Sequence, residues 1–186
     1  MSVTYPPESS IGLTLDDVAH VLKAYKPSAW LDSKNIDIAT HCFVLASKIK
    51  EYRSHFESIL VEFPSSSNFK DPDLLKCTGM LKAEDIDTSY YVPTESLLEC
   101  SNAIAKGNSV QEKCSSLKQQ LSDISSYGAV NGFSFDYGGI AAMVSFDLPS
   151  NIAWHTWHIN ISEKDSNLDY GQFGFLIPYN HDPNYR

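Results

Sequence analysis

The chain has 186 residues, of which 42% are hydrophobic and 12% aromatic, which is enough to bury the core of one domain and excludes wholesale disorder. The formal net charge of −9, with no basic run, argues against binding to nucleic acid and disfavours an anionic membrane surface. No segment has the roughly 18 apolar residues of a transmembrane helix, and the start lacks a signal-peptide pattern. We therefore expect a soluble cytoplasmic protein, with leaderless export left open.

The first two-thirds of the chain has the spacing of helices. Residues 1–13 contain Pro6-Pro7 and predict an irregular lead-in. An apolar stripe with a 3.6-residue period, free of Gly and Pro, runs from Ile36 to Glu62 and predicts a long central helix. Capping residues and helix breakers predict four more helices, over residues 15–25, 72–82, 94–106 and 109–127.

After Gly128 the apolar period changes from 3.6 to 2, which is typical of strands. The alternation predicts four strands, over residues 133–137, 140–148, 153–161 and 172–179. The pair Gly138-Gly139 is typical of a two-residue hairpin, and Pro149 begins a second turn. Short connections of this kind indicate an antiparallel sheet with one face on the helices and the other toward solvent.

The predicted fold class is therefore α+β. About five helices, arranged around the central helix 36–62, pack on a C-terminal, four-stranded antiparallel sheet. We expect one domain over residues 1–186, with a helical part at 14–127 and a sheet part at 128–186.

Four cysteines, none of them in a CxxC motif, offer no support for a zinc site or a thioredoxin-like site. Cys100 and Cys114 lie seven residues on either side of Gly107, so they come level in an antiparallel helical hairpin. For a cytoplasmic chain the favoured interpretation is that all four, including Cys42 and Cys77, are reduced core thiols, with a disulfide as the alternative.

The outward face of the predicted sheet holds the candidate site. Asp136, Asp147 and His158 are the candidate catalytic residues, because two carboxylates and an imidazole can exchange protons. The candidate ligand- or partner-binding residues on the same face are Ser145, Trp154, Thr156, His158 and Asn160. The competing interpretation is an ordinary solvated sheet face. No cofactor motif occurs, and the histidines do not converge on a metal site, so we expect neither cofactor nor metal.

Three functions fit this sequence. The first is a non-catalytic interaction protein, similar in kind to immunity proteins or antitoxins, that binds a basic protein partner through acidic and aromatic residues. The second is an enzyme or small-molecule binder that uses the outward sheet face. The third is a membrane-active protein that rearranges at a bilayer, for which the apolar segment 138–148 is the candidate.

Overall fold

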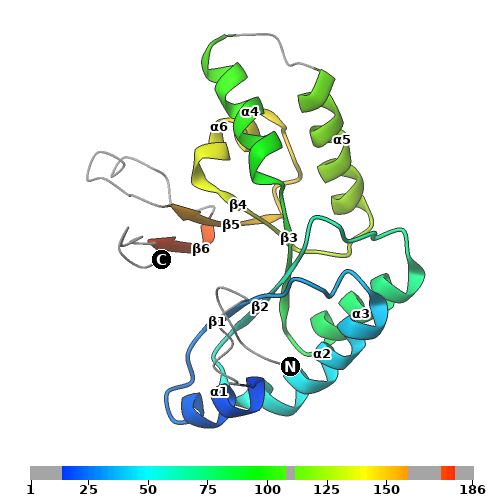
Figure 1. The fold of residues 1–186 in the computed structure, drawn as a ribbon, viewed down its shortest axis with the longest axis vertical. Coiled ribbons are helices and arrows are strands. Elements are labelled where there is room, and N and C mark those ends of the chain that lie inside the picture. Colours follow the sequence, from blue (N-terminus) through cyan, green and yellow to red (C-terminus); the bar gives the residue numbers. More distant parts are fainter. Residues whose placement is uncertain (1–13, 108–111, 159–172, 179–186) are drawn as a thin grey trace.

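A computed structural model describes residues 14–107, 112–158 and 173–178. Its centre is a six-stranded sheet whose strand order, β1-β2-β3-β4-β5-β6, follows the chain (Figure 1). The strands are β1 (Ala29–Asp32), β2 (Ile59–Phe63), β3 (Asp87–Tyr91), β4 (Gly132–Asp136), β5 (Ala153–His158) and β6 (Phe173–Pro178). Every neighbouring pair is parallel.

Helices lie in each of the connections that lead from β1 to β5. They are α2 (Ala39–Tyr52) with η1 (Arg53–His55), α3 (Pro72–Ala83), α4 (Thr94–Ala105), α5 (Glu112–Ser126), and η2 (Tyr137–Gly139) with α6 (Ile140–Ser145). A further helix, α1 (Leu15–Leu22), precedes β1. Parallel strands require such crossovers, so the molecule is a Rossmann-like α/β protein and the predicted antiparallel α+β fold is wrong.

The fold prediction failed in three segments. The predicted helix 36–62 ends as α2 at Tyr52, and the same apolar run continues as strand β2. Residues 87–91, predicted as loop, form β3. The predicted strand 140–148 is instead mostly helix α6, and Gly138-Gly139 lies in η2 rather than in a hairpin turn. The helices predicted at 72–82 and 94–106 are confirmed.

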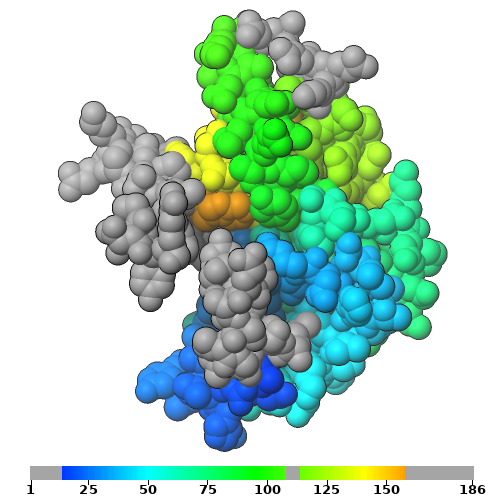
Figure 2. Space-filling model, in the orientation of Figure 1, coloured from blue at the N-terminus to red at the C-terminus, as the bar shows by residue number. Residues whose placement is uncertain are grey.

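The parallel register divides the strand residues between two faces of the sheet. Ile59, Val61 and Phe63 on β2 share one face with Tyr90 on β3 and Phe133 on β4. All five belong to the single cluster of buried apolar residues that also includes side chains from α2, α3, α4 and α5, whereas Leu60, on the opposite face, does not. The helices therefore cover the first face, and α2, α3 and α5 form one continuous side of the molecule (Figure 2).

The opposite face is concave. The indole of Trp30 on β1 lies 6.0 Å, between ring centroids, from both the His155 and the Trp157 rings on β5. Four strand spacings separate β1 from β5, which would be about 19 Å in a flat sheet. Ring contact across that interval requires the sheet to curl strongly, so the strands form a half-barrel. We call the concave side the inner face.

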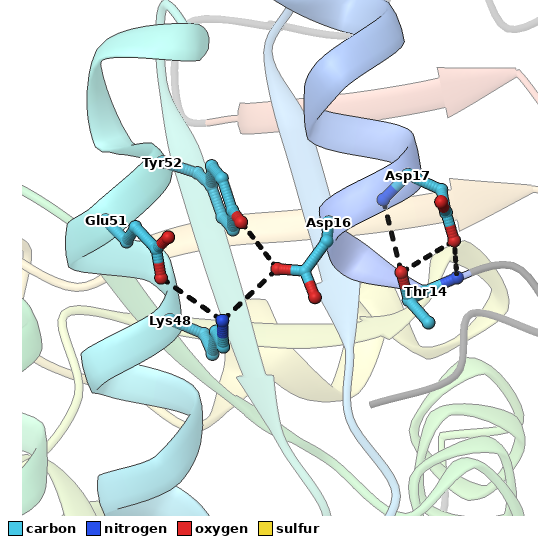
Figure 3. Close-up of polar contacts among 6 residues, drawn as sticks. All are labelled: Thr14, Asp16, Asp17, Lys48, Glu51 and Tyr52. Carbon is cyan, nitrogen blue, oxygen red and sulfur yellow. Dashed lines mark hydrogen bonds and ion pairs between the residues drawn. The ribbon is translucent and has the colours of Figure 1, made fainter.

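Helix α1 is held on α2 by polar contacts (Figure 3). The Asp16 carboxylate accepts hydrogen bonds from the Tyr52 hydroxyl at 2.5 Å and from the Lys48 ammonium at 3.3 Å. These two donors lower the pKa of Asp16, and the hydrogen bond to Asp16 raises the pKa of Tyr52 to about 12. Thr14 and Asp17 form a capping box that starts α1.

The cysteines form two disulfides, so the prediction of reduced thiols is wrong. Cys42 on α2 is bonded to Cys77 on α3, with 6.1 Å between their Cα atoms. Cys100 on α4 is bonded to Cys114 on α5, with a Cα separation of 5.5 Å. Each bridge joins two helices of the outer layer.

In the described ranges, no helix combines the length and the apolar character that spanning a membrane requires.

Candidate functional site

The inner face carries polar and aromatic side chains where the helix-covered face carries aliphatic and phenyl groups. In a parallel sheet, residues two apart on a strand, and register partners on neighbouring strands, share a face. This rule assigns the following residues to the inner face: Trp30, Asp32, Leu60, Glu62, Asp87, Ser89, Tyr91, Gly132, Ser134, Asp136, Ala153, His155 and Trp157. Five of them lie in the last two positions of their strands, namely Asp32, Glu62, Tyr91, Asp136 and Trp157. The carboxyl edge of a parallel sheet is where α/β enzymes place their sites.

Two carboxyl groups stand side by side at this edge. Asp32 and Glu62 are register partners on β1 and β2. Asp32 forms an ion pair with Lys34, with 2.6 Å between Oδ2 and Nζ, and the side chains of Asp32 and Lys34 are 42% and 68% exposed. Glu62 is only 3% exposed. One carboxyl group therefore faces water and a cation, while its neighbour lies inside the protein.

Burial gives Glu62 an unusual protonation behaviour. Loss of solvation, and then the negative charge of Asp32, raise the pKa of Glu62 to about 7, although hydrogen bonding to Ser134 and the charge of Lys34 act in the opposite direction. Within the described part of the chain, the Glu62 Oε2 atom is buried and has no hydrogen-bond partner. Near neutral pH, Glu62 can therefore both hold and release a proton.

Two hydroxyl groups form the floor beside Glu62. The Ser89 and Ser134 Oγ atoms, on neighbouring strands β3 and β4, are hydrogen-bonded to each other and fully buried. Buried hydroxyls need such partners, and this pair fixes its own rotamers. Ser89 is the register partner of Glu62, which places this hydroxyl pair beside Glu62 on the same face.

An aromatic cluster stands next to the carboxyl groups. The Tyr91 and Trp157 rings are parallel, with an interplanar angle of 5° and 5.8 Å between centroids. Trp30 meets Trp157 edge to face. The Tyr91 hydroxyl is hydrogen-bonded to Thr94 at 2.7 Å, and the Lys34 ammonium lies 5.8 Å from the centre of the Tyr91 ring. Tyr91, Trp30 and Trp157 are each partly exposed. We call these three residues the aromatic wall.

His155 lies below the aromatic wall and is 2% exposed. Burial lowers its pKa to about 4, against a small opposite effect of Asp87, so the imidazole is neutral at physiological pH. The ring covers the Cα of Gly132, where an added Cβ would come within 2.4 Å of Nε2. Glycine at 132 therefore makes room for this histidine.

The sequence-predicted residues are dispersed over the structure. Asp136 lies on the inner face at the end of β4, where its Oδ1 accepts a hydrogen bond from the Gly138 amide at 2.8 Å. Asp147 is exposed, with a φ of 51°, beyond α6. His158 is the last residue of β5, with Pro178 as its register partner. The prediction that Asp147 lies on a strand over residues 140–148 is wrong, because 140–145 is helix.

The predicted binding residues also separate. Trp154 and Thr156 lie on the helix-covered face of β5, where Trp154 contacts Phe135 edge to face and Thr156 is fully buried. Ser145 is in α6 and donates a hydrogen bond to the Ala142 carbonyl. Asn160 lies outside the described residues. A binding role for these side chains stays a prediction. The described ones, Ser145, Trp154 and Thr156, do not share the single sheet face on which they were expected.

Sequence reasoning missed Asp32, Glu62 and Tyr91 because it placed none of them on a strand. A usable signal was present in Ile59-Leu-Val-Glu-Phe-Pro64, an apolar run interrupted by one acid and ended by proline. Near-continuous apolar runs are typical of parallel strands buried on both faces, and a lone carboxylate near the end of such a run is a candidate site residue.

Comparison with known proteins gave no match to a family model, to a curated protein or to a solved structure. Within the described residues, no three His, Cys, Asp or Glu side chains converge as a metal site would require. The inner face offers three chemical features, which are a buried carboxyl group, an exposed carboxylate and the aromatic wall.

Proposed function

We propose that the protein is an enzyme that binds a small molecule at the inner face and hydrolyses it by acid–base catalysis. The observation that carries this proposal is the pairing of buried Glu62 with the ion-paired Asp32 at the carboxyl edge of the parallel sheet. Neighbouring carboxyl groups whose surroundings set different protonation states are a recurrent arrangement of acid and base.

Each group has a definite task in this reaction. Glu62 donates its proton to the leaving atom of the substrate as the bond to that atom breaks. Asp32 accepts a proton from the attacking water, whose hydroxyl adds to the substrate. Transfer of the proton from Asp32 to Glu62 then restores both groups. Lys34 holds the Asp32 carboxylate in place through their ion pair.

The test compares Glu62→Gln with wild type on chromogenic aryl glycosides, aryl esters and aryl phosphates. We expect wild type to hydrolyse one class and Glu62→Gln to lose at least 100-fold in kcat/KM, the range that general acid catalysis supplies. Wild-type kcat/KM should fall as pH rises through about 7, where Glu62 loses its proton. The matched control is Glu57→Gln, an exposed glutamate just before the amino end of β2, which should match wild type. Activity that survives in Glu62→Gln would refute the proposal.

The interaction-protein and membrane-active hypotheses stay predictions from sequence, because testing them needs a partner or a bilayer.

The disulfides bear on the cellular location. Stable disulfides belong mostly to oxidising compartments, so we propose an oxidising environment in place of the expected cytoplasm. Protein isolated from its native host and trapped with a thiol-alkylating reagent should show no modified cysteine; four modified cysteines would refute this location.

A further inference from the structure

We propose that the aromatic wall beside Asp32 binds a sugar ring, so that the substrate of this site is a neutral carbohydrate. That the bound sugar is a substrate rests on the proposed function, but the sugar-binding site itself rests on separate observations. These are the geometry of the Trp30, Tyr91 and Trp157 rings, the charges around them, and the acceptors next to them.

The aromatic wall offers a sugar ring partly exposed aromatic surface. Tyr91 and Trp157 are stacked on each other at 5°, and Trp30 meets Trp157 at 66°, so the three rings form a fixed cluster. The faces of aromatic rings carry partial negative charge, and the C–H bonds on one face of a sugar carry partial positive charge. The Tyr91–Thr94 hydrogen bond holds one ring, and packing against His155 holds Trp30. A preorganised wall lowers the entropic cost of binding.

The surrounding charges favour an uncharged ligand. His155 is neutral, and Lys34 is committed to Asp32, so among the described inner-face residues no cation is left over for a phosphate or a carboxylate. The chain's net charge of −9 adds to this repulsion of anions, nucleic acid included. A cationic ligand is disfavoured as well, because the Lys34 ammonium, 5.8 Å from the centre of the Tyr91 ring, would repel it.

Hydroxyl groups find acceptors at the rim of the aromatic wall. Asp32 follows Trp30 by two residues, and Asp136 is the register partner of Trp157. Carboxylates accept hydrogen bonds from two neighbouring hydroxyls of a sugar. Glu62, the register partner of Asp32, would then lie close to an oxygen joining two sugar units.

The test uses the full-length protein with 5-fluorotryptophan incorporated, followed by fluorine NMR. The chain has three tryptophans, of which Trp30 and Trp157 belong to the aromatic wall and Trp154 lies on the opposite face of the sheet as an internal control. The probes are β-1,4-linked hexasaccharides of glucose and of N-acetylglucosamine, with inorganic phosphate and choline for comparison. We expect one hexasaccharide to shift the Trp30 and Trp157 signals and to leave Trp154 unchanged. No shift with either hexasaccharide, or a shift with phosphate or choline alone, would overturn the inference.

Variants separate the site from the catalysis. We expect Trp157→Ala to weaken hexasaccharide binding at least tenfold, while Trp157→Phe, which keeps a ring, stays within about threefold of wild type. If Trp157→Ala fails to fold, the Trp157 signal in wild-type protein still decides the matter. Glu62→Gln should bind the hexasaccharide as wild type does. Binding without turnover by wild type would sink the proposed hydrolysis and leave the sugar site standing, and turnover of a non-sugar substrate alone would do the reverse.

Discussion

Gly132 shows how closely side chains pack on the inner face. A Cβ at this position would lie 2.4 Å from Nε2 and 2.6 Å from Cδ2 of His155, and 3.2 Å from the Ala153 carbonyl oxygen. The imidazole has little room to retreat, because it is buried and in edge contact with Trp30. The absence of a side chain at 132 is therefore a steric requirement of the site.

We predict that Gly132→Ala lowers the free energy of unfolding by about 1–3 kcal/mol, the usual cost of overpacking a buried position. The matched control is Gly79→Ala on helix α3, where an added Cβ meets nothing within 4 Å. Alanine is the better helix former, so this control should gain about 0.5–1 kcal/mol. Urea unfolding of both variants measures the two effects, and equal stability of the two would contradict the steric argument.

At the scale of elements, the disulfides join neighbouring helices of the outer layer and leave the inner face untouched. Cys42–Cys77 closes a sequence interval of 35 residues and Cys100–Cys114 one of 14. All four sulfur-bearing residues are buried. Their main effect is to restrict the unfolded chain, and that restriction grows with the closed interval.

We predict that Cys42→Ala/Cys77→Ala lowers the free energy of unfolding by about 4 kcal/mol and that Cys100→Ala/Cys114→Ala lowers it by about 3 kcal/mol, from loop-closure entropy. Urea unfolding without reductant measures both losses. Addition of dithiothreitol should lower the wild-type midpoint and leave a variant without any cysteine unchanged. A wild-type midpoint that ignores the reductant would show that the bridges do not form.

Sequence reasoning located most helices because their signals are local. Asp71 before Pro72, for example, starts α3, and its side chain accepts a hydrogen bond from the Asp73 amide. It misplaced β2 because the apolar period of α2 runs on through Arg53–His55 into Ile59–Phe63 without a glycine or proline. It missed β3 because Asp87-Thr-Ser-Tyr-Tyr91 has polar residues on its inner face, as a strand lining a site must.

At the scale of the whole molecule, the direction of the strands was the decisive unknown. Alternation after Gly128 correctly indicated β4 and β5, but a period of two does not distinguish parallel from antiparallel pairing. The reading of Gly138-Gly139 as a hairpin turn then fixed the wrong direction for the entire sheet. Of the candidate catalytic residues, Asp136 is the one whose side chain the structure places on the inner face, and Glu62 and Asp32 become neighbours only once β1 and β2 are recognised as parallel.

The parallel half-barrel buries two titratable groups whose effects on stability have opposite signs. The pKa of Glu62 is about 7 in the folded protein against 4.5 ordinarily, so the folded state binds the extra proton and stability falls as pH rises from 4.5 to 7. The pKa of His155 is about 4 against 6.5, so the unfolded state binds the extra proton and stability falls as pH drops from 6.5 to 4. Each effect amounts to about 3 kcal/mol at most.

Between pH 4.5 and 6.5 the Glu62 and His155 effects oppose each other. Their summed contribution to the free energy of unfolding of wild type should therefore change little over this range. We predict that Glu62→Gln removes one of them. Relative to wild type, this variant should gain stability as pH rises from 4.5 to 7 and should be up to about 3 kcal/mol more stable at pH 8. Urea unfolding at half-unit steps from pH 4 to 8 measures the difference, with Glu57→Gln as the control. A constant difference between Glu62→Gln and wild type across that range would mean that Glu62 is not the buried acid on which the proposed chemistry depends. If Glu62→Gln is instead the more stable protein at pH 8 and has lost hydrolytic activity, wild type gives up stability in order to keep a catalytic carboxyl group inside the sheet.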